Sequence, residues 1–386
     1  MKILIVSHEY PPVGGGGANA CYFLSREYAA QGHEVTVLTA QFHGNPQDEM
    51  INGVHIHRVD VKRKKQEKSN LLEMGFFLMK AWKKAEKLQE QYQFDISQIF
   101  FGIPSGPVGL HLKRKYQLPY IVRFGGGDIP GAQKRYALLY KVLNPFLRNI
   151  WKNASGLVAN SEGLQLRAER FEDKYPIACI ANGVDTEFFH PAESKNMQDV
   201  EAPEMEIKSK DITVLFVSRL IEGKGLQDII PHLQKISEAS GRKVLLQIVG
   251  DGPYRENLEA LTRETHMEQY VTFEGRKNKQ ELLSYYGSAD FFILPSRSEG
   301  MPNVVLEAMA MGLPIIMTPC EGSKELIHEN GYIAPIDQFI ERMITMCKDK
   351  QLRNQFGRRS MELIQSEFTW SDKAKQYISL MENCVE

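Results

Sequence analysis

Short apolar segments alternate with longer stretches at helical spacing along most of the chain. In the first half, the apolar segments are residues 3–6, 35–38, 96–101, 120–124, 156–159 and 177–181. Helical stretches such as 18–31, 71–91 and 133–152 separate them. Short buried strands alternating with helices are typical of parallel sheets that are covered on both faces. The pattern therefore predicts an α/β domain.

The second half repeats this pattern after an interruption. Residues 186–210 are polar and acidic, contain Pro191 and Pro203, and are interpreted as a linker. The apolar segments then resume at residues 213–217, 244–249, 271–274, 291–294 and 314–317. We therefore expect two doubly wound domains, at residues 1–190 and 211–369, with a linker at 191–210. Ligands of such sheets bind outside the carboxyl ends of the strands.

Composition narrows the class of protein. The chain has 386 residues, of which 42% are hydrophobic and 25% charged, as in soluble globular proteins. No segment approaches the roughly 20 apolar residues that span a bilayer. The five cysteines show no Cys-x-x-Cys spacing, which favours free thiols in a reducing cytoplasm. Residues 1–195 carry a net charge of +6 and residues 196–386 carry −7, so the first half is expected to face something anionic.

Two cations follow the strand predicted at residues 213–217. Arg219 and Lys224 lie on either side of a turn in which Gly223 and Gly225 allow close backbone approach. Two positive side chains and free backbone N–H groups suit a diphosphate. Two solvated surface cations remain the alternative. Two later turns, Gly250-Asp251-Gly252-Pro253 and Gly275-Arg276, are weak signals by themselves.

The segment at residues 295–314 is the most informative. Pro302 is tolerated only in the first turn of a helix, and Gly312 and Pro314 end that helix. The helix between them is apolar on all sides and is therefore predicted to be buried, yet it contains Glu307, and Glu299 precedes it. A buried carboxylate needs an Arg, a Lys or the hydroxyls of a ligand as its partner.

A sugar diphosphate fits these requirements. The unpaired N–H groups of the first helical turn attract phosphate, while Glu299 and Glu307 accept hydroxyl groups of the sugar and of the ribose. The alternative is a salt-bridged Glu307 and an ordinary loop residue at Glu299.

The segment resembles the E-x7-E motif of the retaining glycosyltransferases of family 4. The resemblance extends over nearly the whole chain through the motifs at residues 14–17, 182–185, 250–253 and 368–370. It implies the GT-B fold, in which two Rossmann-like doubly wound domains hold the donor site in the cleft between them. It also implies that the last helix, at 370–386, crosses back to complete the N-terminal, acceptor-binding domain.

The resemblance also implies roles for individual residues. Arg219 and Lys224 would bind the donor diphosphate and stabilise the leaving group, Glu299 would contact the transferred sugar, and Glu307 the ribose. Backbone groups around Arg276 would meet the base. The implied donor-binding residues are Gly15, Gly16, Arg219, Lys224, Gly250, Arg276, Glu299, Gly300, Met301, Asn303, Val304 and Glu307. The nucleotide-sugar is a substrate, and we expect no cofactor and no metal, because the sequence contains no Asp-x-Asp and cations are already present.

The chain departs from the family at one position. Much of the family has a His near the reacting sugar, just ahead of a Gly and an Asp, and here Gly125 takes its place. The candidates to supply a side chain are Asp128, Arg123 and His8, and Asp128 ranks first because it follows three glycines after a strand. A turn-capping role for Asp128 is an equal alternative.

The function predicted is transfer of a hexosyl or N-acetylhexosaminyl unit from a UDP- or GDP-sugar to a glycan or lipid-linked acceptor, in the synthesis of surface polysaccharides such as lipopolysaccharide. A nucleotide-sugar epimerase or a phosphorylase of the same fold is an alternative, as is a non-catalytic glycan-binding subunit. A dinucleotide-dependent oxidoreductase is disfavoured, because residues 8–14 separate the first strand from the Gly-x-Gly-x-x-Ala pattern.

Apolar residues recur at helical spacing in the last helix. They are Phe368, Trp370, Ala374, Tyr377, Ile378 and Met381.

A basic segment precedes the helix expected at 71–91. Its cations are Lys62, Arg63, Lys64, Lys65 and Lys68, and the helix mixes lysines with Phe76, Phe77, Leu78 and Trp82. This mixture suits peripheral contact with an anionic membrane, whereas the alternative is an ordinary amphipathic helix with its aromatic side chains in the core. Nucleic acid is a poorer partner, because the whole chain is nearly neutral.

Overall fold

The computed structural model describes residues 1–63, 65, 69–130, 137–191 and 211–385. It divides into two compact units, one formed by Met1–Gly183 with Trp370–Glu386 and the other by Val184–Thr369. Nearly all of the expected linker at 191–210 lies outside the described residues, as do Lys64, Lys68 and the start of the helix expected at 133–152.

The described strands of the first unit form one sheet in the order β3-β4-β2-β1-β5-β6-β7-β8. Their bounds are β1 Lys2–Val6, β2 Glu34–Gln41, β3 Asp48–Ile51, β4 Val54–Asp60, β5 Ile96–Phe100, β6 Tyr120–Arg123, β7 Gly156–Ala159 and β8 Ile177–Cys179. All neighbours pair in parallel except β3 and β4, which are antiparallel. The sheet is thus parallel, as predicted, apart from the antiparallel edge strand β3, which the sequence analysis did not predict.

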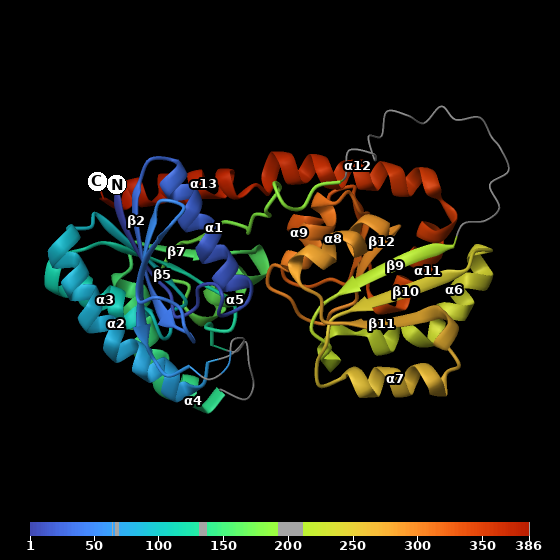
Figure 1. The fold of residues 1–386 in the computed structure, drawn as a ribbon, viewed down its shortest axis with the longest axis horizontal. Helices are drawn as coiled ribbons and strands as arrows, with labels where there is room; N and C mark the ends of the chain where they lie inside the picture. Colours follow the sequence, from blue (N-terminus) through green and yellow to red (C-terminus); the bar gives the residue numbers. More distant parts are fainter. Residues whose placement is uncertain (64, 66–68, 131–136, 192–210, 386) are drawn as a thin grey trace. The chain divides into compact units, whose positions relative to one another are not determined.

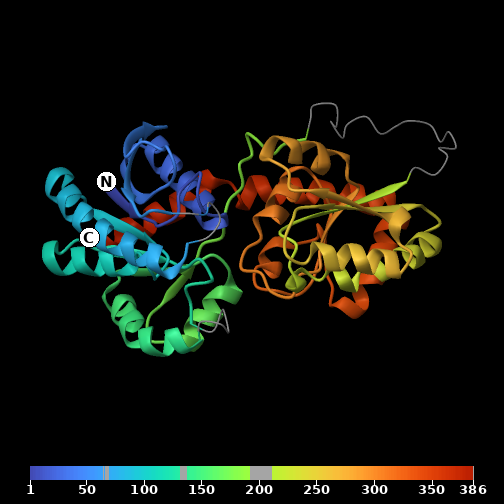
Figure 2. The same ribbon diagram turned by 60° about the horizontal axis from the view of Figure 1, so that its bottom comes forward.

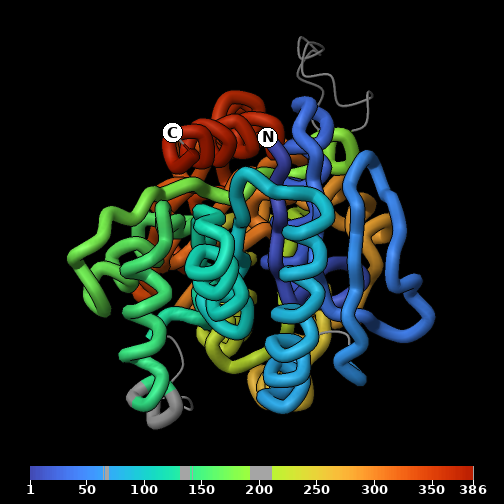
Figure 3. The backbone as a smooth tube through the Cα atoms, turned by 90° about the vertical axis from the view of Figure 1, so that its left-hand side faces the viewer, coloured from blue at the N-terminus to red at the C-terminus, as the bar shows by residue number. Residues whose placement is uncertain are grey.

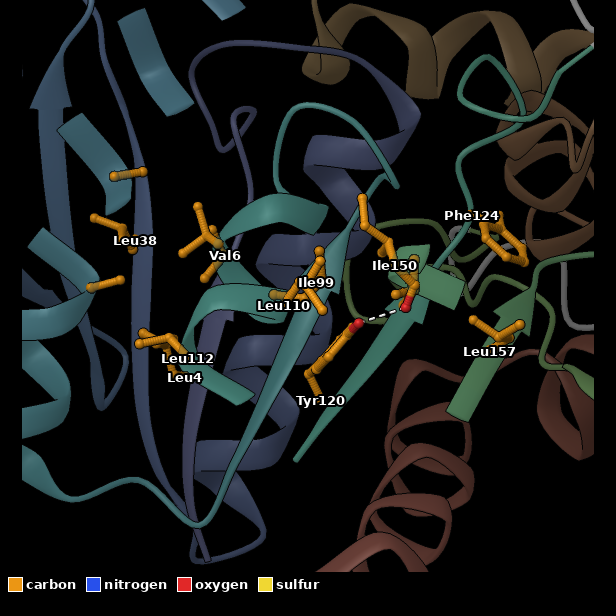
Figure 4. Packing of buried hydrophobic residues seen from close by; sticks show 14 of the residues in the cluster. Leu4, Val6, Leu38, Ile99, Leu110, Leu112, Tyr120, Phe124, Ile150 and Leu157 are labelled. Atoms are coloured by element: carbon orange, nitrogen blue, oxygen red, sulfur yellow. Dashed lines mark hydrogen bonds between the residues drawn. The ribbon is translucent and has the colours of Figure 1, made fainter. Parts of the chain in front are cut away.

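Two helical layers cover the first sheet. The helices are α1 Gly16–Ala30, α2 Leu71–Tyr92, α3 Gly106–Tyr116, α4 Ala137–Asn153, α5 Glu162–Phe171 and α13 Trp370–Val385. Leu4 and Val6 of β1 face a core shared with α2, α3, α4 and α5, whereas Ile3 and Ile5 face a core shared with α1 and α13. Figure 4 shows the first core, where the Tyr120 hydroxyl donates to the Ile150 carbonyl at 2.5 Å.

Helix α13 completes the first unit, as the resemblance to family 4 implied. Figures 1 and 3 show it in red beside the blue N-terminal segments. The Trp370 ring stacks on Phe23 of α1, with centroids 5.5 Å apart and planes 9° from parallel. Ala374, Tyr377 and Met381 are fully buried behind it. The last helix is thus an integral layer of the unit that contains the N-terminus.

The second unit contains a parallel sheet, with helices on both faces (Figure 2). The described strands have the order β11-β10-β9-β12-β13-β14. The strand bounds are β9 Ile212–Val217, β10 Val244–Val249, β11 Val271–Gly275, β12 Phe291–Leu294, β13 Ile315–Met317 and β14 Gly331–Ile333. The α-helices are α6 Leu233–Ser240, α7 Arg255–Glu264, α8 Lys279–Ser288, α9 Asn303–Ala310, α10 Ser323–Leu326, α11 Ile336–Lys348 and α12 Lys350–Glu367.

Each sheet has a point where the strand order reverses. In the first sheet the chain proceeds from β1 outwards to β2 and later returns to add β5 on the other side of β1. In the second sheet it proceeds from β9 to β10 and β11 and then adds β12 on the other side of β9. Loops diverge at such a point and leave a crevice at the carboxyl ends of the strands, where ligands of these sheets bind. Among the described helices, none is long and apolar enough to cross a bilayer.

Candidate active site

The carboxyl edge of the second sheet carries the predicted donor residues in spatial order. Arg276 follows β11 and Gly250 follows β10. Arg219 and Lys224 follow β9, and Glu299 follows β12. Since the sheet order is β11-β10-β9-β12, these residues follow successive strands along one edge. Arg219, Lys224 and Glu299 lie in the loops after β9 and β12, the two strands that flank the reversal point.

Glycines hold these loops against one another. Gly225 has φ +77°, and a Cβ added to it would lie 1.9 Å from the carbonyl oxygen of Pro295. Gly250 has φ +138°, and a Cβ there would lie 1.9 Å from the carbonyl oxygen of Ser218. Side chains are excluded at both positions by sterics and by backbone conformation. The loops after β9, β10 and β12 therefore form one closely packed surface.

Lys224 and Glu299 are joined directly. Lys224 Nζ donates to Glu299 Oε1 at 2.5 Å, and the two side chains are 17% and 13% exposed. The backbone supports this pair, because Arg297 N–H donates to the Gly223 carbonyl at 2.8 Å. Arg219 is exposed and has no ion-pair partner among the described residues. The loop after β9 thus carries Lys224, which is paired, and Arg219, which is available to an anion.

Glu307 has a partner that the sequence did not suggest. We expected an Arg, a Lys or a ligand, but the Tyr286 hydroxyl of α8 donates to Glu307 Oε2 at 2.9 Å. Burial raises the pKa of Glu307 to about 7, while the bond from Tyr286 and the charge of Lys279 oppose that shift. Tyrosine was overlooked because a hydroxyl donor leaves no charge signal in the sequence. Near neutral pH this carboxyl group is therefore poised between its two protonation states.

The N-terminus of α9 lies directly after the loop that carries Glu299. Pro302 precedes the helix, as its position in the sequence predicted, and Gly312 adopts φ +75° just beyond its end. Met301 is buried, whereas Gly300, Asn303 and Val304 are partly exposed. The first-turn N–H groups of a helix lack intrahelical partners and favour anions. This turn is therefore able to receive a phosphate.

The glycine loop of the first unit leads into α1. Gly15 caps the helix and Gly16 is its first residue. The carboxylate of Glu9 lies here as well and accepts a hydrogen bond from the Gly15 backbone, while Arg63 lies 3.6 Å from it. Burial raises the pKa of Glu9, and Arg63 opposes this shift. Sequence reasoning missed Glu9, which occupies an anion-binding helix terminus.

Asp128 joins two loops of the first unit. Its Oδ2 accepts the Gly102 N–H at 2.8 Å and its Oδ1 accepts the Gly125 N–H at 2.9 Å. Burial raises the pKa of Asp128, and these two backbone bonds act against the shift. The side chain therefore fixes the turn around Gly125 and ties it to the loop after β5.

The two other candidates near Gly125 are also buried. Arg123 donates to Asn182 Oδ1 at 2.5 Å, and its guanidinium lies 5.2 Å from the Phe100 ring centroid. His8 follows β1, and burial together with the charge of Arg63 lowers its pKa to about 3. His8 is therefore neutral at any physiological pH, and Arg123 is bonded within the core of the unit.

The predicted basic segment is only partly a surface feature. Arg63 is buried and donates hydrogen bonds to the carbonyl groups of Lys65 and His8. It therefore stabilises the fold and does not contribute to a basic surface. Phe77 is also buried, and Trp82 stacks against His111 with centroids 4.1 Å apart. These positions correct the interpretation of a continuous basic and aromatic surface.

One face of α2 nevertheless remains exposed. Leu72, Phe76 and Met79 recur one helical turn apart and are 76%, 44% and 59% exposed. The exposed Lys80 and Lys83 continue the same face. We call these five residues the α2 face.

Two family models together match most of the chain. Residues 14–188 match Glycosyltransferase Family 4, and residues 197–362 match Glycosyl transferases group 1. N-acetyl-alpha-D-glucosaminyl L-malate synthase of Bacillus anthracis is 26% identical, over 98% of this chain and 96% of that protein.

Solved structures share the arrangement of both sheets. Sucrose-phosphate synthase of Thermosynechococcus elongatus superimposes with a TM-score of 0.81 at 21% identity, covering 99% of this chain and 98% of that one. Anabaena HepE in complex with UDP gives a TM-score of 0.72 at 17% identity, covering 99% and 100%. The fold is GT-B, and the protein is an enzyme that transfers a sugar from a nucleotide-sugar donor. More particularly, the chain belongs to the family 4 (group 1) glycosyltransferases.

Proposed function

We propose that this enzyme transfers a hexosyl or N-acetylhexosaminyl unit, with retention of anomeric configuration, from a UDP- or GDP-sugar to a glycan or lipid-linked acceptor of surface polysaccharide synthesis. The observation that carries the proposal is the Lys224–Glu299 pair beside Arg219 at the reversal point of the second sheet. In this proposal the second unit holds the donor and the first unit, completed by α13, holds the acceptor.

The cations act on the leaving group. When the bond to the sugar breaks, negative charge develops on the departing diphosphate, and preorganised cations stabilise it. Lys224 is held by Glu299 and is therefore positioned before the donor arrives, whereas Arg219 is exposed and available to the donor phosphates. Diphosphate binding shifts Lys224 toward the phosphates and releases a Glu299 oxygen to accept a sugar hydroxyl. One ion pair thus links recognition of the sugar to stabilisation of the leaving group.

Retention is what the resemblance to the retaining glycosyltransferases of family 4 implies. Before the donor binds, Glu299 is engaged with Lys224, and Glu307 with Tyr286. Neither is a free nucleophile that would form a covalent glycosyl-enzyme, so in this proposal retention comes from attack by the acceptor on the face that the diphosphate leaves. The leaving phosphate then accepts the acceptor's proton. The protein contributes mainly positioning and charge stabilisation.

The nucleotide is proposed from the remaining donor residues. Glu307 accepts ribose hydroxyls, and backbone groups beside Arg276 and Gly250 meet the base, which suits a uracil or a guanine. The UDP complex of the structurally similar HepE supports the choice of UDP as the first donor nucleotide to test.

The enzyme is also proposed to contact an anionic membrane peripherally, through the α2 face. An apolar stripe followed by lysines matches the acyl boundary and the anionic headgroups of such a surface. Figure 3 shows α2, in light blue, running along the outside of its unit. A lipid-linked acceptor would then be delivered from that surface to the first unit.

A donor panel tests the function. UDP- and GDP-sugars are screened for thermal stabilisation, and a ligand at 100 times its dissociation constant should add about 2.7 kcal/mol of stability. The stabilising donor is then incubated with candidate acceptors, and the anomeric configuration of the product is read by proton NMR. An inverted product would reject retention, and an isomerised donor without transfer would indicate an epimerase.

A further inference from the structure

A pocket opens in the first unit at the carboxyl edge of its sheet. Its volume is about 460 Å³, which lies within the range of roughly 300–1,000 Å³ that is common for small-molecule sites. Ligands of doubly wound sheets bind at this edge. The residues that line the pocket all belong to the first unit and come from the ends of the neighbouring strands β2 and β4 and the loops after them: Gln41, His43, Gly44, Asp60, Lys62 and Arg63.

The charges around the pocket leave one cation over. Asp60 is already engaged, because its Oδ1 accepts the Lys62 N–H at 2.9 Å and its Oδ2 lies 3.9 Å from Lys80 Nζ. Glu9 is engaged as well, with its Oε1 3.6 Å from Arg63 Nη2. Lys62 is exposed, and its ammonium group forms no salt bridge with any described residue. The positive charge of Lys62 is therefore available to an anion in the pocket.

Arg63 adds a second positive charge that is fixed in place. Its side chain is buried, and it donates to the His8 carbonyl at 3.3 Å and to the Lys65 carbonyl at 3.0 Å. A charge that is held away from bulk water is screened less than a surface charge. Glu9, which pairs with Arg63, also accepts a hydrogen bond from the Gly15 backbone. The pocket is thus joined to the glycine loop that leads into α1.

The other polar side chains of the pocket suit hydroxyl groups. Asp60 and His43 are both exposed, and a carboxylate accepts hydrogen bonds while an imidazole can donate or accept one. Gln41 is held in place, because its Nε2 donates to the Asn45 carbonyl at 2.8 Å. Cations beside hydroxyl-binding groups fit a small molecule that carries both an oxyanion and hydroxyl groups.

We propose that this pocket binds an oxyanion, a phosphate or a carboxylate, carried by a hydroxylated acceptor. Lys62 and Arg63 attract the negative charge, and Asp60 accepts a hydroxyl group. The inference rests on the proposed function, in which the first unit holds the acceptor, and it adds that the acceptor is anionic. It also gives the basic segment after β4 a role within the unit.

The oxyanion can come from a water-soluble acceptor or from the headgroup of a lipid-linked one. Lys80 belongs to the α2 face and also donates a hydrogen bond to the Asp60 carbonyl. The pocket and the α2 face are therefore joined through this one lysine. Both sources present the same chemistry to Lys62 and Arg63, and the experiments below distinguish them.

Calorimetry on the full chain tests the binding. The nucleoside diphosphate selected by the donor panel is kept at saturation, so that Arg219 and Lys224 are occupied, and glucose 6-phosphate, gluconate and neutral glucose are titrated in turn. We expect at least one of the two anions to bind more tightly than glucose. Lys62→Gln should weaken that binding roughly 10-fold, because a charge-assisted contact is lost. Lys83→Gln is the matched control, since it removes an exposed cation of the same unit outside the pocket.

The sign of the effect provides a second test. Asp60→Asn keeps an oxygen that accepts the Lys62 N–H but removes a negative charge. Binding of inorganic phosphate should therefore strengthen, by about 2-fold or more, in Asp60→Asn and weaken in Lys62→Gln. The opposite pair of changes would show that the pocket prefers cations and would overturn the inference.

A third variant separates binding from support of the fold. Lys62 adopts φ +53°, a left-handed conformation that glycine tolerates better than lysine. Lys62→Gly should therefore leave the melting temperature unchanged or raise it while still weakening anion binding. Gln117→Gly is its control, because Gln117 has φ +58° at the end of α3, and the same relief there should leave anion binding within about 2-fold of wild type.

Vesicles that contain phosphatidic acid distinguish the two sources. If the oxyanion is carried by a lipid, glucose 6-phosphate should compete with vesicle binding, and Lys62→Gln should lower that binding. If the acceptor is soluble, vesicle binding should be the same in Lys62→Gln and wild type, and only the calorimetric affinity should fall. Both results support the pocket and assign its ligand.

The inference fails if neither glucose 6-phosphate nor gluconate binds better than glucose, or if Lys62→Gln binds them as tightly as wild type. Neither result affects the proposed function, because no transfer step enters these measurements. A wild-type protein that transfers from none of the UDP- or GDP-sugars would instead reject the proposed function, and the calorimetric titrations would still decide whether the pocket binds anions.

Discussion

The Tyr286 hydroxyl donates a hydrogen bond to Glu307 Oε2 at 2.9 Å and thereby couples α8 to α9 at the donor edge of the second sheet. The same hydroxyl lies 3.4 Å from the Val304 carbonyl, so it also contacts the first turn of α9. Tyr286 is fully buried, and desolvation raises its pKa well above the ordinary value. The pair is therefore a neutral donor facing a carboxyl group that titrates near neutrality.

Stability should depend on pH through Glu307. Its pKa of about 7 in the folded protein lies above the ordinary value of 4.5, so the folded state binds more protons between these two values. Stability from this group is thus present below about pH 4.5 and is lost as the pH rises through 7. Glu307→Gln should be more stable than wild type at pH 8 by roughly 2 kcal/mol, and about equal at pH 5. Denaturant unfolding at both pH values measures this, and parallel pH profiles would contradict it.

Nucleotide binding tests the other role of Glu307. If it accepts ribose hydroxyls, Glu307→Gln should weaken binding of the nucleoside diphosphate by about 1–3 kcal/mol. A deoxyribose analogue should bind wild type and variant about equally, as calorimetry would show. Tyr286→Phe is the control, because it removes the bond to Glu307 and leaves the carboxyl group in place. If Glu307→Gln still discriminates between the nucleoside diphosphate and its deoxyribose analogue as wild type does, Glu307 has only a structural role.

Arg219 and Lys224, which we call the diphosphate clamp, should be essential for turnover. Lys224→Ala and Arg219→Ala should each lower kcat by roughly 10²–10³, since each removes a positive charge that stabilises the leaving group. Arg297→Ala is the matched control, because Arg297 lies in the adjoining loop after β12 but pairs with Asp228 at 3.2 Å. Initial rates at saturating donor measure the effect. Near-normal turnover in both clamp variants would remove these cations from the mechanism.

Because Arg219 and Lys224 are proposed to supply the positive charge, activity should not need a divalent metal. Rates in the presence of excess EDTA should remain within about 2-fold of those with added Mg²⁺ or Mn²⁺. If EDTA abolishes activity and either ion restores it, Arg219 and Lys224 do not supply enough positive charge without a metal.

Membrane contact should reside on the α2 face. The protein should co-sediment with liposomes that contain anionic lipid at low salt and detach as salt screens the lysines. Replacing Leu72, Phe76 and Met79 with Ser should abolish sedimentation while preserving activity on a water-soluble acceptor. These side chains are exposed, so the fold should tolerate the change. Substituting Arg63 would be uninformative, because it is buried. Wild-type protein that ignores anionic liposomes at low ionic strength would refute the proposal.

Much of the fold could be predicted because buried parallel strands are short continuous apolar runs. The strands at 156–159, 244–249 and 291–294 have the predicted bounds. β3 and β4 were missed, since polar residues interrupt their apolar positions, as in His55 and His57 of β4. A search for continuous apolar runs does not detect such alternation.

The positions of the candidate residues were predictable where charged residues follow apolar strands. The sequence pattern indicated that Lys224 and Glu299 each follow a strand, whereas their pairing depends on the strand order, in which β9 and β12 are neighbours. Tyr286 could not be found this way. Its contact with Glu307 is created only by the packing of distant segments.

Completion of the first unit by α13 has a consequence for synthesis of the protein. The Trp370, Tyr377 and Met381 side chains that seal one face of its sheet are translated only after the whole of Val184–Thr369. At about 5–20 residues per second, that delay is roughly 10–40 s. During this interval the nascent first unit presents an uncovered apolar face beside Phe23 and Tyr28, while the intervening unit is already contiguous and able to fold. The second unit is therefore the first whose residues are all available for folding, and the first unit can close its core only when α13 has been made.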